Sequence, residues 1–292
     1  MRLCRVEHAN KIWIARHHEQ SCEIHLLFEA ADYGDSLIAL IGNAEELSLK
    51  TGSAVHIVGS DAVRYLPPIS QPSKNILCVG KNYRAHAAEF ANSGFDNSQA
   101  PNEDSVPRHP IVFSKAPCTM TGAFERIEPP WKITQKVDYE AELGVVIGKT
   151  GRNIQRDKAY QHVFGYTIIN DVTARDLQAQ HKQWLLGKSI DTFCPIGPWV
   201  ATSDEVEPEN LDVKCWVNGE LRQHANTRDL IFDIPTIIET ISASMTLNPG
   251  DIIATGTPAG VGIGFDPPKF LQPGDLVKIK ISTIGTIENR VL

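Results

Sequence analysis

The pattern of apolar and polar positions divides the chain into two parts. Up to residue 65, short apolar stretches alternate with polar breaks, which is typical of short strands with one or two weak helices. Residues 66–75 then contain three prolines and two serines. Because proline removes a backbone donor and blocks regular pairing, this stretch is predicted to be a linker. We therefore expect a small N-terminal domain over residues 1–70 and a larger catalytic domain over residues 71–292.

The second part carries a denser succession of predicted elements. Apolar runs of strand length occur at 75–80, 110–115, 138–148 and 164–171. Helices are expected at 82–90, with Asn82 as N-cap, and at 233–245; residues 212–221 are expected to form a hairpin that turns at Asn218-Gly219. Many strands with few helices predict a mixed, β-rich α+β fold rather than a doubly wound parallel sheet.

A long polar segment follows the first predicted helix. Residues 91–109 contain Gly and Pro and no apolar periodicity, so they are expected to be a loop. Long loops in compact domains are often lids or binding loops, and plain disorder is the alternative. We expect this loop to carry substrate specificity.

Composition narrows the classes of partner and location. The net charge is −7, so the chain offers no basic surplus for nucleic acid or an anionic membrane. No apolar run approaches the roughly 20 residues that span a bilayer, and the charged N-terminus does not resemble a secretory signal. The six cysteines are scattered without a CxxC pair, which is typical of reduced thiols rather than a zinc site. A cytoplasmic location is expected.

Carboxylates cluster on one of the predicted strands. Glu140 and Glu142 are two residues apart, so they project from the same face, and Asp138 shares that face. Such a pair is common on solvated strands, but this strand continues into an apolar run, where unpaired carboxylates are costly. Asp171 ends the next apolar strand, where it is placed either to bind a metal or to cap the following helix. Three carboxylates without nearby His or Cys favour Mg²⁺, Mn²⁺ or Ca²⁺ over zinc.

A second pair of residues has the spacing of a catalytic dyad. His86 and Glu89 are three apart on the predicted helix, so the carboxylate can orient the imidazole, as in general base catalysis. An inconsequential surface pair is the alternative.

Two glycine-containing segments are not nucleotide motifs. Lys182 replaces the glycine that a P-loop needs before residues 187–189, and Pro258 interrupts the glycine-rich segment 255–264, which we interpret as a tight substrate-lining turn.

These segments together resemble the fumarylacetoacetate hydrolase family, in its shorter branch of acylpyruvases and oxaloacetate decarboxylases. The resemblance runs nearly continuously from residue 75 to residue 290, through GKNYRAHAAEF, IVFSKAP, DYEAELGVVIGK, GYTIINDVTARDLQ, LLGKSIDTFCPIGPWV, VNGELRQ and PGDIIATGTPAGVG. Residues 1–70 resemble the family's variable N-terminal domain only loosely. The resemblance implies a mixed β-roll flanked by short helices, and a homodimer.

The resemblance also implies roles for individual residues. Glu140, Glu142 and Asp171 would bind Mg²⁺ or Mn²⁺, and His86 with Glu89 would activate a water. The remaining implied site residues are Lys188 near the substrate's oxyanion, Arg175 and Gln178 near its oxyanion and carboxylate, and Thr257 and Lys115 lining the substrate. Longer family members carry a further Asp ligand where this chain has Val79.

The resulting expectation is a metal-dependent hydrolase that cleaves a C–C bond in a small 2,4-dioxo acid, giving pyruvate and a carboxylic acid. The metal would act as a Lewis acid, His86 as general base, and Lys188 would neutralise developing negative charge. Alternatives are decarboxylation of oxaloacetate or a related 2-oxo diacid, or isomerisation or decarboxylation of an aromatic-degradation intermediate. A catalytically silent binding protein is a third class, against which the dyad and Lys188 argue.

Overall fold

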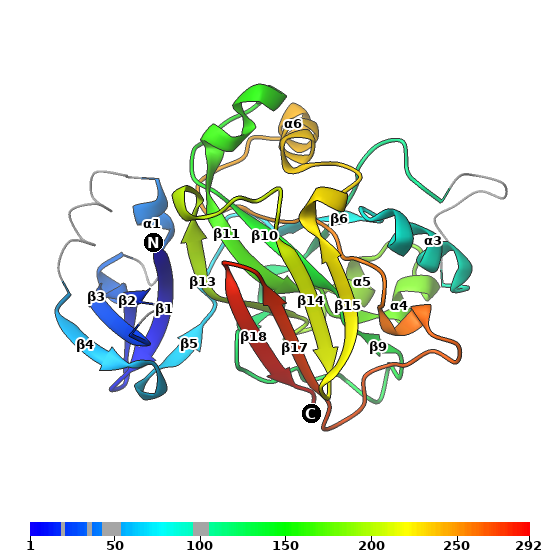
Figure 1. Ribbon diagram of the computed structural model, residues 1–292, viewed down its shortest axis with the longest axis horizontal. Helices are drawn as coiled ribbons and strands as arrows, with labels where there is room; N and C mark the ends of the chain where they lie inside the picture. The colour runs from blue at the N-terminus through cyan, green and yellow to red at the C-terminus, as the bar shows by residue number, and fades with distance from the viewer. Residues whose placement is uncertain (19–20, 34–36, 43–53, 96–104) are drawn as a thin grey trace.

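The computed structural model describes residues 1–18, 21–33, 37–42, 54–95 and 105–292. Its strands form three sheets, and short helices lie around them (Figure 1). The strands are β1 Arg2–His8, β2 Lys11–His18, β3 Glu23–Glu29, β4 His56–Gly59, β5 Arg64–Leu66, β6 Ile76–Gly80, β7 Ile111–Lys115, β8 Met120–Gly122, β9 Val137–Asp138, β10 Ala141–Ile147, β11 Val163–Asn170, β12 Thr173–Ala174, β13 Cys194–Thr202, β14 Asp212–Val217, β15 Glu220–Asn226, β16 Ile252–Ala254, β17 Leu276–Ile281 and β18 Gly285–Arg290. The helices are α1 Ile38–Ile41, α3 Arg84–Asn92, α4 Arg175–Gln180, α5 Leu185–Lys188 and α6 Ile234–Ser244.

The largest sheet joins both sequence regions. Its strand order is β4-β3-β2-β1-β13-β11-β10-β16-β6-β7, with β5 paired to β1 and β8 to β13. Strand β1 pairs antiparallel with β13, so the N-terminal strands extend the sheet of the larger region. The β8–β13 and β16–β6 pairs are parallel and the other pairs are antiparallel, which makes the sheet mixed. The expected mixed α+β class is confirmed, and the domain boundary at residue 70 stays a prediction.

A four-stranded sheet packs against the larger one to form the main core. Its order is β15-β14-β17-β18, and alternate residues of β14 and β17 point into the protein. Their buried side chains meet those of β10, β11 and α6 in one continuous apolar cluster. Helix α6 begins where the Asp233 side chain accepts a hydrogen bond from Thr236 N, and it buries four isoleucines. This packed roll supports the strands that carry the candidate site.

Most of the predicted elements are confirmed. The Asn218-Gly219 turn has positive φ at both residues, 52° and 83°, as a two-residue hairpin turn requires. The helix predicted at 82–90 spans Arg84–Asn92, but its N-cap is Tyr83 and not Asn82. The Asn82 side chain is fully buried and bonds instead to the backbone of Phe232 and Thr255. Within the predicted loop 91–109, residues 96–104 lie outside the described residues. Whether this loop acts as a lid therefore stays a prediction.

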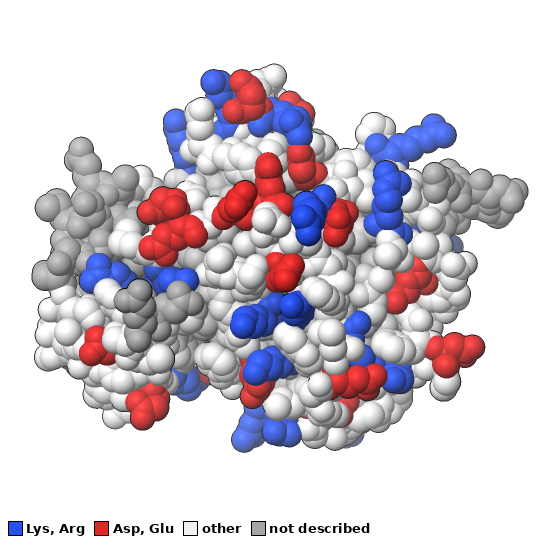
Figure 2. All heavy atoms as spheres, viewed as in Figure 1, with Lys and Arg blue, Asp and Glu red and all other residues white. Residues whose placement is uncertain are grey.

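The surface shows mixed charge. On the face shown in Figure 2, Lys and Arg are interspersed with Asp and Glu, and neither sign forms a continuous field. Among the described residues, no helix is long and apolar enough to cross a membrane.

Candidate active site and metal centre

Two neighbouring strands bring three carboxylates together. Strand β10 pairs with β11 so that Ala141 lies opposite Asn170, which places Glu140 and Glu142 beside Asp171. Asp171 N donates a hydrogen bond to Glu140 O at 2.8 Å, which fixes the end of the β10–β11 strand pair. One carboxylate oxygen of each acid lies within 4.8 Å of those of the other two, and all three residues are buried. The prediction that Glu140 and Glu142 share one face is therefore confirmed.

Two lysines neutralise part of this cluster. Lys188 Nζ lies 2.8 Å from both Glu140 Oε2 and Asp171 Oδ2, so one ammonium group bridges two of the acids. Lys115 Nζ lies 2.7 Å from Asp171 Oδ1 and also donates to the carbonyl oxygens of Val172 and Lys188. Lys115 thus reaches the acids from the side of β7 and holds the chain at α5, a role that the substrate-lining assignment does not describe.

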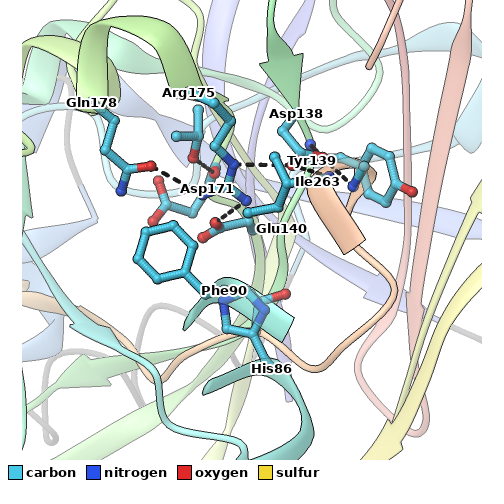
Figure 3. Close-up of polar contacts among 12 residues, drawn as sticks. His86, Phe90, Asp138, Tyr139, Glu140, Asp171, Arg175, Gln178 and Ile263 are labelled. Carbon is cyan, nitrogen blue, oxygen red and sulfur yellow. Dashed lines mark hydrogen bonds and ion pairs between the residues drawn. The ribbon is translucent and has the colours of Figure 1, made fainter. Parts of the chain in front are cut away.

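Arg175 organises the other side of the cluster. It stands at the start of α4, where its Nε lies 3.0 Å from Asp138 Oδ2 and its Nη2 lies 2.6 Å from Glu140 Oε1 (Figure 3). Its Nη1 also donates to Gln178 Oε1 at 3.2 Å, one helical turn on. Asp138 was placed by sequence on the metal-binding face, yet it does not join the group of three. It accepts backbone hydrogen bonds and holds Arg175.

The pKa values of the acids show how unevenly they are neutralised. Burial acts to raise the pKa of Glu140, but Lys188 and Arg175 outweigh it and lower this pKa to about 2. Burial, together with the negative charges of Asp171 and Glu140, raises the pKa of Glu142 well above its usual range.

A cation among these oxygens would remove the repulsion that raises the pKa of Glu142. Three buried carboxylates form a hard, all-oxygen donor set of the kind that Mg²⁺ and Mn²⁺ prefer. Lys188, which bridges two of the acids, already shows that positive charge is accommodated there. The donor set of Glu140, Glu142 and Asp171 therefore fits a divalent cation.

The predicted dyad is formed on helix α3. His86 Nδ1 lies 3.1 Å from Glu89 Oε2, and the imidazole is buried against the ring of Phe90, with the ring centroids 6.2 Å apart. Figure 3 shows His86 directed from α3 toward Glu140. Because Nδ1 is bound by the carboxylate, Nε2 is the nitrogen that can exchange a proton with a substrate. His86 and Glu89 are therefore arranged as base and orienting group.

The glycine-rich segment 255–264 orients acids on both sides of the site. Its backbone amides donate to three different carboxylates, namely Gly256 N to Glu142 Oε2, Gly260 N to Glu89 Oε1, and Gly262 N and Ile263 N to Asp138. A Cβ on Gly264 would lie 1.6 Å from Glu89 Oε1, so only glycine leaves room for this side chain. Sequence reasoning expected a substrate-lining turn here. The contact between amides and acids was not visible without the fold.

The site residues surround a small cavity. Its volume is about 20 Å³, enough for a water molecule. The lining residues are Val79, Gly80, Lys81, His86, Phe90, Phe113, Glu140, Glu142, Arg175, Gln178, Trp184, Lys188 and Thr257. Seven of the predicted site residues therefore face one cavity, whereas Glu89, Asp171 and Lys115 support it from behind.

Besides the lining residues Gly80, Lys81, Phe90 and Phe113, sequence reasoning missed two further residues that touch the cavity or its lining. Gln223, from β15, is fully buried and donates to Thr257 Oγ1 at 2.8 Å, which fixes the threonine that lines the cavity. Trp184 packs its ring against Phe90 and Phe113 and closes one wall. Gln223 ends the segment VNGELRQ, which carries the family resemblance but no spacing that suggests chemistry, and Trp184 lies outside those segments. The signal available for Trp184 was only its position four residues before Lys188.

Comparisons with known proteins show which family and which solved structures the chain is similar to. Residues 75–292 match the model of the fumarylacetoacetate hydrolase C-terminal family. The chain is 48% identical over 268 residues to the oxaloacetate tautomerase YisK of Bacillus subtilis, covering 91% of this chain and 86% of that protein. A fumarylacetoacetate hydrolase of Exiguobacterium antarcticum shares 39% identity with a TM-score of 0.83, covering 100% of this chain and 99% of that one. A maleylpyruvate hydrolase of Sphingobium, in complex with manganese(II) and pyruvate, shares 32% identity with a TM-score of 0.76 over 100% and 99% of the two chains.

Proposed function

The chain belongs to the fumarylacetoacetate hydrolase family, and from this premise we propose that it is a Mg²⁺- or Mn²⁺-dependent tautomerase of oxaloacetate or a closely related 2-oxo dicarboxylate. The observation that carries the proposal is the position of His86, whose ring is oriented by Glu89 and faces the cavity of the acidic cluster. The likeness to YisK, an oxaloacetate tautomerase, supports this choice of substrate.

The reaction moves one proton from oxygen to carbon. In the ketonising direction, the enol hydroxyl gives up its proton, its O–H electron pair becomes the second bond of the carbonyl, and the C2=C3 pair takes a proton at C3. When bound, a divalent cation at Glu140, Glu142 and Asp171 supplies a Lewis acid for the substrate oxygens. The protein must then provide a proton donor at C3 and positive charge near the C2 oxygen.

The described residues provide both. We assign both proton transfers to His86 Nε2, which accepts the proton of the enol hydroxyl and then delivers it to C3, with Glu89 holding the ring and stabilising its protonated form. Lys188, whose ammonium lies beside Glu140 and Asp171, neutralises charge at the C2 oxygen. Arg175 and Gln178 receive the substrate's C1 carboxylate. His86, Lys188, Arg175 and Gln178 are all buried, which limits contact with bulk water and strengthens each electrostatic interaction.

The test is direct. Enol oxaloacetate would be added to the enzyme with Mg²⁺ or Mn²⁺, and the loss of its ultraviolet absorbance followed against the spontaneous rate. In D₂O, NMR should show accelerated uptake of deuterium at C3. If the enzyme with either metal leaves both rates at their spontaneous values, the proposal is wrong.

Hydrolysis of an acylpyruvate is a second candidate, favoured by the same dyad. His86 held by Glu89 can deprotonate a water as readily as it can protonate carbon, and one relative in the comparison is a maleylpyruvate hydrolase. Release of pyruvate from a panel of acylpyruvates, measured beside oxaloacetate tautomerisation and decarboxylation, separates the candidates. A hydrolase would show metal-dependent pyruvate release with no acceleration of enol loss.

A further inference from the structure

Strand β15 turns one glutamine side chain into the protein behind the candidate site. Cys215 of β14 lies opposite Gln223, whereas Trp216 lies opposite Leu221, so β15 has one extra residue, Arg222, at a bulge. Bulges of this kind re-aim side chains and are frequent next to active sites. Gln223 is fully buried, and its amide reaches two segments of the site that are distant in sequence.

The Gln223 amide joins strand β10 to the glycine-rich segment 255–264. Its Oε1 accepts a hydrogen bond from Ala141 N at 3.1 Å, between the two glutamates of the acidic cluster. Its Nε2 donates to Thr257 Oγ1 at 2.8 Å and to Pro258 O at 2.7 Å. Because a backbone N–H can only donate and a carbonyl oxygen can only accept, these partners fix which end of the amide is nitrogen. Both amide hydrogens are therefore engaged, and the bond to Thr257 has one direction only.

The direction of this hydrogen bond decides what Thr257 offers to the cavity. A hydroxyl has one proton and two lone pairs, so a threonine that accepts from an amide keeps its proton for another partner. Thr257 is 2% exposed and lines the cavity, and within the described parts of the chain its hydroxyl proton has no acceptor. A buried donor without an acceptor is costly, so an acceptor oxygen of a bound molecule fits this position.

The glycine-rich segment packs closely against the bulge of β15. A Cβ on Gly260 would lie 1.9 Å from Arg222 O, and the φ of Gly260 is 100°, a value that suits glycine. The segment therefore approaches β15 more closely than a residue with a side chain would allow. This contact fixes Thr257 relative to the Gln223 amide before any substrate binds, as preorganisation of a donor requires.

We propose that Gln223 is a positioning residue that holds the Thr257 hydroxyl as a hydrogen-bond donor toward the substrate. The inference rests on the proposed function, because it takes an anionic oxygen of a 2-oxo acid as the group that Thr257 meets. A donor whose direction is fixed in advance favours carboxylate oxygens, which only accept, over groups that donate. A hydrogen bond to a charged oxygen contributes about 10- to 100-fold in affinity.

Oxalate is the probe, because its oxygens only accept hydrogen bonds at neutral pH. It would be titrated by calorimetry into protein saturated with Mg²⁺, so that changes in metal affinity do not enter. Thr257→Val removes the donor and should weaken oxalate binding by about 10- to 100-fold. Gln223→Met should weaken it less, because the hydroxyl can then turn but can still donate. Gln223→Glu should weaken it at least as much as Thr257→Val, since its second oxygen accepts the Thr257 proton.

Two comparisons separate positioning from damage to the fold. Gln223→Met leaves three partners unbonded, whereas Gln223→Glu still accepts from Ala141 N, so structural damage alone would make the methionine variant the weaker binder. In the Thr257→Val background, Gln223→Met should add no further loss, and Gln223→Glu should lose part of its effect. The second of these decides the question if the methionine variant does not fold. Gln155→Met and Gln155→Glu are the matched controls, because Gln155 is exposed and lies outside the cavity lining.

Three results would each overturn the inference. Thr257→Val could leave oxalate affinity unchanged, Gln223→Met could bind oxalate more weakly than Gln223→Glu, or the losses from Gln223 variants could persist undiminished in the valine background. Failure of the proposed function is seen separately, in wild-type protein that does not accelerate enol loss, since the binding comparison requires no turnover.

Discussion

The acids on the strands and the dyad on helix α3 face the same cavity, but they are held in different ways. Glu140 and Asp171 stand on adjoining chain segments in the middle of the largest sheet. Each is paired with two cations, so removal of one partner leaves another in place. Breaking a buried ion pair typically costs about 3–5 kcal/mol, which makes this cluster part of the fold as well as of the site.

The dyad has far fewer supports. His86 is held through one hydrogen bond to Glu89, and Glu89 in turn accepts one from Gly260 N. Helix α3 has nine residues, and its N-cap side chain makes no capping hydrogen bond. A short helix of this kind depends on tertiary contacts for its stability.

The difference matches the two tasks that we propose for the site. Binding a divalent cation requires several oxygens at fixed positions, which a sheet provides. Proton transfer requires a base within hydrogen-bond reach of the proton that it moves, and this contact often tightens only when the substrate binds. The segment 255–264 connects the two, since its amides bind Glu142 on one side and Glu89 on the other.

The largest expected effect comes from the strand-borne group. Glu142→Ala deletes a charged oxygen ligand, so affinity for Mg²⁺ or Mn²⁺ should fall by more than about 100-fold, beyond the usual effect of an outer-shell change. Turnover should fall to background, as it should in wild-type protein treated with EDTA. Titration calorimetry measures the affinity, and Glu23→Ala, at the exposed first position of strand β3, is the control. Full turnover after exhaustive chelation would contradict the metal assignment.

The next effect separates the dyad from the acids. His86→Ala should lower acylpyruvate cleavage, or proton transfer at C3, by about 10²–10⁴-fold, the usual contribution of a general base. Metal affinity should not change, because His86 is not among the three ligands. Oxaloacetate decarboxylation should suffer much less, since it requires no activated water.

A control variant and one contrary outcome test this comparison. His224→Ala removes an exposed imidazole from β15 and should leave all activities unchanged. If His86→Ala lowers cleavage and decarboxylation by the same factor, the histidine is not a dedicated base, and an orienting role for it becomes the better interpretation.

The same contrast explains what could be predicted from sequence. The acidic cluster could be predicted because alternation along a strand and an apolar continuation are local signals. The His86–Glu89 contact was accessible because it spans three positions of one helix. Asn82 was misassigned as a cap because the capping rule is local, whereas its actual partners lie about 150 and 173 positions away.

Long-range contacts explain why other site residues were misassigned or missed in the sequence. Asp138 shares the strand face of the ligands in sequence, and only the fold shows that Arg175 and two loop amides bind it. Lys81 was overlooked because it lies between two predicted elements, and no sequence rule indicates that its side chain enters the cavity. The role of Gly264 depends on a contact with α3 that no local pattern records.

The smallest effect tests the link between the two regions. Gly264→Ala adds a methyl group at a point 1.6 Å from Glu89 Oε1, so the carboxylate must move and its hydrogen bond from Gly260 N must weaken. His86 would then lose its orienting partner while the acidic cluster stays intact. We expect a loss of about 10-fold in turnover, as for an outer-shell contact, with unchanged metal affinity.

Glu89→Gln provides the reference value for that loss, because it removes the charge that orients His86, leaves the sequence of the loop unchanged and keeps a side-chain oxygen that can accept from Gly260 N. Gly42→Ala is the matched control, since an added Cβ there meets nothing closer than 3.5 Å and its φ of −79° suits alanine. If Gly264→Ala acts through the dyad, its turnover should match that of Glu89→Gln, and the double variant should be no worse than either one. Additive losses would mean that the loop acts on the site by another route, through Glu142 or Asp138. The strand-borne acids and the helix-borne dyad would then not be as separate as their contacts indicate.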